Sequence, residues 1–122
     1  MRFIQESGFN VRVGRGEAFR QWLAANEERI ARSYPEGTEY LGTYVAVFTS
    51  EKTAGEYRVL ERLSSYADID RLAALGKDDT TEFAKVWREF TQFFDPDPHA
   101  DWCKVLLKGA VEATGWDIQP EG

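Results

Sequence analysis

The longest strand candidate in the sequence, residues 40–48, is apolar on both of its faces. Because strand side chains alternate between two faces, one face would carry Tyr40, Gly42, Tyr44, Ala46 and Phe48, and the other Leu41, Thr43, Val45 and Val47. Two amphipathic helices can cover only one face of a four-stranded sheet, so a second copy of the chain is the natural cover for the other. The pattern therefore predicts a homodimer, and it specifies no reaction.

Length and composition predict a single domain. The 122 residues are 43% hydrophobic and 14% aromatic, which is enough to bury a core without disulfides or a structural metal. We expect one domain over residues 1–118, followed by a loose tail over residues 119–122.

Charge, cysteine content and the first residues bear on partners and location. The 15 Lys and Arg are scattered among 21 Asp and Glu, for a net charge of −6, so we expect no nucleic-acid partner. The single cysteine, Cys103, excludes an intrachain disulfide and fits a reducing compartment. The start lacks the apolar core of a signal peptide, and no uncharged run approaches ~18 residues. We therefore expect a cytoplasmic protein that does not enter a membrane.

The spacing of apolar residues predicts the order strand, helix, strand, strand, helix, strand. Alternation marks a first strand over residues 3–13, with Phe3 and Phe9 on its apolar face, and steps of three and four residues mark a helix from Phe19 to Tyr34. Glu82 follows Asp79 by three positions, so we expect Asp79 to cap a helix that runs to Phe94. The other expected elements are strands at 40–48, at 56–63 and within 102–113, and a short helical segment at 65–76.

This order is the split βαβ pattern, so we expect an α+β fold, a ferredoxin-like βαββαβ sandwich with a four-stranded antiparallel sheet. Residues 11–19, a strand that ends in the turn Gly14-Arg15-Gly16 before an acidic, aromatic helix start, resemble the opening of the dimeric α+β barrel superfamily. Residues 40–44, followed by residues 55–58, look similar to a hairpin of its NIPSNAP-like and antibiotic-biosynthesis-monooxygenase-like members. The resemblance implies that two sheets pair into one barrel with the helices outside.

The resemblance implies more than one function, because the superfamily includes cofactor-free monooxygenases, haem-degrading monooxygenases and isomerases. The haem-degrading type uses an Asn on the first strand, a Trp, and an iron-binding His on its second long helix. Asn10 matches the Asn by position, but residues 79–94 contain no His. This departure argues against haem, and we expect no cofactor.

The candidate ligand-binding residues follow from the chemistry of the cofactor-free type. Such an oxygenase holds a deprotonated phenol in a dry pocket with Asn, Trp, Tyr or Arg groups. Residues of these kinds are Asn10, Trp22, Tyr44, Tyr57, Arg58 and Trp87. The alternatives are core packing for both tryptophans, a shared face of Tyr40 and Tyr44 that serves packing instead of a pocket, and an edge-strand charge for Arg58.

His99, the one histidine, lies in a loop with Asp95, Asp97 and Asp101. Such a loop can bind a divalent ion, but no diagnostic ligand spacing is present, so we expect a solvated loop and no metal. Cys103 is expected to be a buried strand residue.

Two functions stay open from the sequence, beside metal-dependent chemistry at His99 and its neighbouring acids. The first is a small-molecule protein, such as a cofactor-free monooxygenase or isomerase acting on an aromatic or polyketide-like compound. The second is a non-catalytic dimeric module that binds a ligand or supports a partner. An open cavity reached by Asn10, Tyr44 and Arg58 would favour the first, and a closed seam filled by Trp22, Trp87, Phe83 and Phe90 would favour the second.

Overall fold

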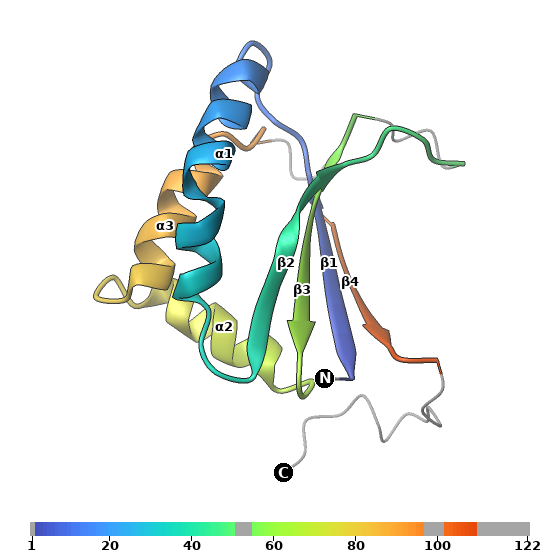
Figure 1. Cartoon of the computed structure of the whole chain (residues 1–122), viewed down its shortest axis with the longest axis vertical. Helices are drawn as coiled ribbons and strands as arrows, with labels where there is room; N and C mark the ends of the chain where they lie inside the picture. Colours follow the sequence, from blue (N-terminus) through green and yellow to red (C-terminus); the bar gives the residue numbers. More distant parts are fainter. Residues whose placement is uncertain (1, 51–54, 97–101, 110–122) are drawn as a thin grey trace.

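The computed structural model describes residues 2–50, 55–96 and 102–109. Its elements, in chain order, are β1 (Phe3–Phe9), α1 (Gly16–Ser33), β2 (Thr38–Val45), β3 (Tyr57–Leu63), α2 (Asp68–Lys77), α3 (Glu82–Thr91) and β4 (Trp102–Leu107) (Figure 1). The expected order is confirmed, with α2 as the short helical segment. The loop that holds Asp97, His99 and Asp101 and the tail over residues 119–122 lie outside the described residues.

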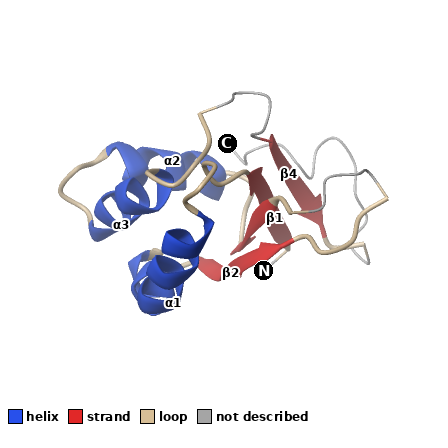
Figure 2. Ribbon diagram, turned by 90° about the horizontal axis from the view of Figure 1, so that it is seen from above, coloured by secondary structure: helices blue, strands red, loops and turns tan. Residues whose placement is uncertain are grey.

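The four strands form one antiparallel sheet in the order β2-β3-β1-β4, so β1 and β3 are its inner strands. The helices α1, α2 and α3 lie together on one face of this sheet, and none of these three lies over the other face (Figure 2). The expected fold class, α+β with a four-stranded antiparallel sheet, is therefore confirmed. We call the layer between sheet and helices the seam, and the uncovered face the open face.

The core fills the seam because alternate strand residues and one stripe of each helix face each other there. Phe3 and Phe9 of β1 are buried, as predicted for the apolar face of the first strand, and Val59 and Leu63 of β3 are buried with them. The helices contribute mainly Phe19, Ile30, Leu72, Phe83, Val86 and Phe90. This packing holds the helices against one face of the hydrogen-bonded sheet.

The predicted start of α3 is wrong by two residues. Thr81 is the N-cap, and its side-chain oxygen accepts a hydrogen bond from the Ala84 amide at 3.1 Å. Asp79 instead forms an exposed ion pair with Arg88. A threonine hydroxyl satisfies the free amides of a first helical turn as the expected Asp79 would have done.

A β-bulge overturns the expected pairing of Tyr40 with Tyr44 on one face. The register of β2 against β3 shifts between Tyr40 and Gly42, which inserts Leu41 as an extra residue. One extra residue reverses the side to which later side chains point. Tyr40 therefore lies in the seam, 8% exposed, whereas Tyr44 lies opposite Arg58 on the open face and is 56% exposed.

Two strands are shorter than predicted. β1 ends at Phe9, and Val13 is fully in solvent, because the chain leaves the sheet there toward α1. β2 ends at Val45, and residues 46–50 continue beyond the sheet on the side away from the helices (Figures 1 and 2). We call residues 46–50 the arm; its Val47 and Phe48 are each 87% exposed. The two-faced pattern of residues 40–48 thus arises from a bulge and an arm, and not from one regular strand.

Candidate functional site

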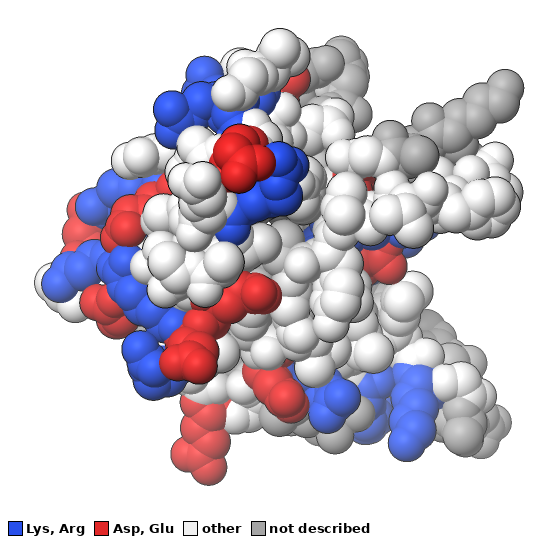
Figure 3. Space-filling model, turned by 45° about the horizontal axis from the view of Figure 1, so that its top comes forward, with Lys and Arg blue, Asp and Glu red and all other residues white. Residues whose placement is uncertain are grey.

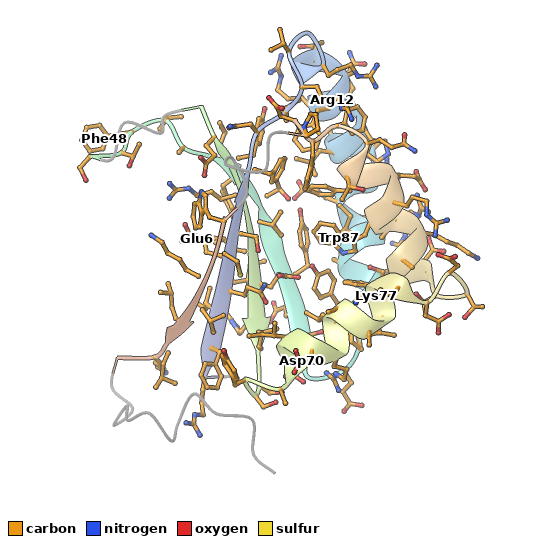
Figure 4. The ribbon with its side chains drawn as sticks, turned by 180° about the vertical axis from the view of Figure 1, so that it is seen from behind. Glu6, Arg12, Phe48, Asp70, Lys77 and Trp87 are labelled. Atoms are coloured by element: carbon orange, nitrogen blue, oxygen red, sulfur yellow. The ribbon has the colours of Figure 1, made fainter. Side chains whose placement is uncertain are left out.

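Three of the predicted ligand-binding residues, Trp22, Tyr57 and Trp87, pack in the seam. The centre of the Tyr57 ring lies 5.0 Å from that of the Phe19 ring. The ring centres of Trp22 and Trp87 lie 5.5 Å and 4.6 Å from that of Phe90. Trp87 points from α3 toward the sheet (Figure 4). These contacts fit the core-packing alternative for both tryptophans, and they place Tyr57 among the same aromatic rings.

A buried acid and phenol meet at the centre of the seam, a pair that the sequence did not suggest. Glu61 of β3 is 7% exposed and accepts a hydrogen bond from the hydroxyl of Tyr34, which follows α1. Burial raises the pKa of Glu61, and the Tyr34 bond lowers it in part. Burial and the Glu61 charge raise the pKa of Tyr34. Burial therefore disfavours the ionised form of both groups.

The polar cluster extends to Tyr40 and Trp87. The Tyr40 hydroxyl donates to Glu27 at 3.0 Å and lies 2.5 Å from the Thr43 hydroxyl. Burial raises the pKa of the Tyr40 hydroxyl. The hydrogen bond with Thr43 opposes this rise, and the charge of Glu27 adds to it. The Trp87 Nε1 atom is buried with no hydrogen-bond partner among the described residues, although its N–H is near enough to oppose the rise in the pKa of Tyr34. This cluster has the donors and acids that proton transfer requires.

Tyr44 and Arg58 lie on the open face instead, with Trp102 as a third member. Because Gly8 pairs with both Arg58 and Trp102, the three strands bring these side chains together on one side of the sheet. The Arg58 guanidinium carbon is 5.1 Å from the centre of the Trp102 ring and its Nη1 is 3.2 Å from Glu6. Arg58 Nε is buried with no partner among the described residues. Arg58 is on inner strand β3, so the edge-charge alternative is wrong.

Trp102 was not among the residues predicted for this site. Its indole N–H donates to Glu56, which is only 8% exposed, and its ring lies directly over Gly8, where an added Cβ would overlap it. Lys104 also approaches the Trp102 ring, at 5.1 Å. A glycine inside a strand often marks such a close approach, and Gly8 was therefore the signal in the sequence.

A hollow of about 440 Å³ lies at the other end of the open face. It is lined by Arg2, Ile4, Arg62, Leu106, Leu107 and Lys108. Basic side chains gather at the lower end of the sheet in Figure 3, whereas charges of both signs alternate over the helices. The open face therefore offers apolar surface and positive charge in one place.

The one remaining predicted residue, Asn10, joins neither group. Asn10 follows β1, and its backbone oxygen accepts a hydrogen bond from the Asp95 amide at 2.7 Å. The six predicted residues thus divide between the seam, the open face and this junction, and do not converge on one pocket.

Cys103 is exposed on edge strand β4, where its Sγ lies 3.1 Å from the Gln5 amide nitrogen, so its expected burial is wrong. Within residues 2–50, 55–96 and 102–109, no three His, Cys, Asp or Glu side chains gather as a metal site would require.

Over the described part of the chain, fold and site together define an α+β protein with three helices on one face of its sheet and the other face open. Solved structures with this fold include a NIPSNAP family protein from Agrobacterium tumefaciens, with a TM-score of 0.58 and 13% identity over 88% of this chain and 92% of that chain. A second protein from that organism gives 0.56 and 16% over 85% and 90%, and a conserved protein from Methanosarcina mazei gives 0.54 and 16% over 88% and 94%. The fold is therefore NIPSNAP-like.

The sequence matches no family model and no curated protein. The structural likeness, at these identities, establishes the fold and leaves the activity to be argued from the site. Among the helices of the described residues, none combines the length and apolar character that crossing a membrane requires.

Proposed function

We propose that the chain is a homodimeric module that holds a small organic molecule at the open face of its sheet. The contrast between the two faces of the sheet carries this proposal. Phe19 and Phe90 are completely buried in the seam, whereas Ile4, Tyr44 and Leu106 stay 37%, 56% and 49% exposed on the open face, where the hollow also lies. Side chains fill the seam, which is the arrangement that we expected for a binding module and not for an enzyme with its active site there.

A second copy of the chain is the proposed cover for this face. Two of its arginines already form ion pairs within the face, Arg58 with Glu6 at 3.2 Å and Arg62 with Glu39 at 3.4 Å, which lowers the like-charge repulsion between two identical faces. The arm extends on the same side of the sheet, with Phe48 at a distance from the helices (Figure 4). A partner across the open face would cover the apolar side chains of the arm as well.

Sedimentation velocity tests the dimer. We expect twice the chain mass for the wild-type protein and a monomer for Tyr44→Asp, because a charge would be buried between the two sheets. Val13→Asp is the matched control, since Val13 is 99% exposed and outside the open face. A monomeric wild type, or a Tyr44→Asp protein that stays as dimeric as the control, would contradict the dimer.

Native mass spectrometry of protein purified gently from its expression host tests the ligand. We expect a dimer that carries an additional small-molecule mass, which is lost on denaturation. A dimer that never carries such a mass, and that shows no thermal shift with a library of organic compounds, would contradict the binding function.

A second candidate is a cofactor-free monooxygenase or isomerase acting on an aromatic or polyketide-like compound. One observation favours it: the buried cluster of Tyr34, Tyr40 and Glu61 has the groups for moving a proton, and it lies beside the Trp87 N–H, for which the described residues provide no hydrogen-bond partner. Oxygen uptake with a panel of electron-rich phenols is the test. Turnover that Glu61→Gln abolishes in a folded protein would support this candidate, and equal turnover in that variant would contradict it.

A further inference from the structure

The hollow at the end of the open face combines an apolar floor with basic side chains. Its volume of about 440 Å³ is within the range of small-molecule sites. We infer that it binds an organic anion with an apolar body, that is, an alkyl or aryl chain that ends in a carboxylate or phosphate. This inference rests on the proposed ligand-binding function and adds the chemical class of the ligand.

The floor of the hollow is built by three neighbouring strands. Ile4 of β1 pairs with Arg62 of β3 on one side and with Leu106 of β4 on the other. Directly paired residues point to the same face of a sheet, so the two apolar side chains and the arginine form one row. Ile4 is 37% exposed and Leu106 is 49% exposed. An apolar ligand body that covers them would remove this surface from water.

The basic side chains supply the recognition of an anion. Arg62 lies 3.4 Å from Glu39, but the two side chains are 45% and 51% exposed, so this ion pair is weak. The pair involves one guanidinium nitrogen, and the remaining donors match the oxygens of a carboxylate or phosphate. The Lys108 amide donates to the Arg2 carbonyl oxygen at 2.9 Å, which fixes two more basic residues at the same end of the sheet.

Protection of sheet edges accounts for neither Arg62 nor Arg2. Lysine and other charges on an edge strand discourage pairing with another sheet. Arg62 belongs to β3 and Arg2 directly precedes β1, and both are inner strands in the order β2-β3-β1-β4. The whole chain carries a net charge of −6, so a basic cluster beside exposed leucine and isoleucine is a local departure from its composition. Binding of an amphipathic anion accounts for both features.

Calorimetric titration of the full chain with decanoate, decyl phosphate and decanol tests the inference. We expect saturable binding of at least one anion, and about tenfold or more weaker binding of decanol, because a charge-assisted hydrogen bond is lost. Arg62→Gln should weaken binding of the anion by a similar factor, and Lys108→Gln serves as a second variant if the first fails to fold. Arg32→Gln on α1 is the matched control, since Arg32 is 72% exposed and pairs only with Glu28 among the described ion pairs.

Two results would overturn the inference: decanol binding as tightly as both anions, or anion affinity that is unchanged in folded Arg62→Gln and Lys108→Gln proteins. Sedimentation of the same samples separates this outcome from failure of the proposed function. A dimer that retains a neutral compound from its host would keep the proposed function and overturn the anionic class. Titration that depends on Arg62 in a monomeric protein would support the anion site and contradict the dimer.

Discussion

Replacing Phe90 by alanine should remove much of the stability of this fold. Phe90 is completely buried. The centre of its ring lies 4.6 Å, 5.5 Å, 5.6 Å and 5.7 Å from the ring centres of Trp87, Trp22, Phe9 and Phe19, respectively. Phe→Ala in a core costs about 3–5 kcal/mol, and the loss of several ring contacts favours the upper end. Since small domains have only about 5–15 kcal/mol in total, Phe90→Ala should be near the limit of folding.

Urea unfolding followed by circular dichroism measures this loss, as a lower midpoint at an unchanged slope. Val13→Ala is the control, because the Val13 side chain is 99% exposed and lies outside the open face, so this change should stay within about 0.5 kcal/mol. Repeating both measurements at about tenfold higher protein concentration separates any contribution of dimer formation, which depends on concentration. Equal losses in the two variants would refute the assignment of Phe90 to the centre of the seam.

Two further predictions concern buried charge and helix capping. Burial raises the pKa of Glu61 above its ordinary value of 4.5, so the folded protein binds this proton more tightly than the unfolded chain, and stability falls as pH rises from about 4.5 through the folded-state pKa. Glu61→Gln stays neutral, so in urea melts its stability relative to wild type should increase from acidic to neutral pH; a difference independent of pH would contradict this. Thr81→Ala should cost about 0.5–2 kcal/mol as a lost N-cap. Asp79→Ala removes only an exposed ion pair and should cost less than about 1 kcal/mol; the reverse order would assign the cap to Asp79.

Local patterns in the sequence were sufficient for the elements and for the seam. Alternation in β1 predicted that Phe3 and Phe9 share a buried face, and the stripe of α3 predicted that Phe83 and Phe90 lie in the core. These predictions hold because the period of each element fixes which neighbours along the chain share a face. The class of fold followed from the order of the elements.

The tertiary structure decided how the candidate site residues are distributed, because that depends on strands far apart in the sequence. The bulge at Leu41 separates Tyr44 from Tyr40, and only the pairing of β1 with β3 and β4 brings Arg58 and Trp102 together over Gly8. The partners of Glu61 and the row of Arg62, Ile4 and Leu106 depend on long-range register in the same way. Sequence periodicity sets which face of its own element a side chain occupies, whereas strand register sets which distant side chain it meets.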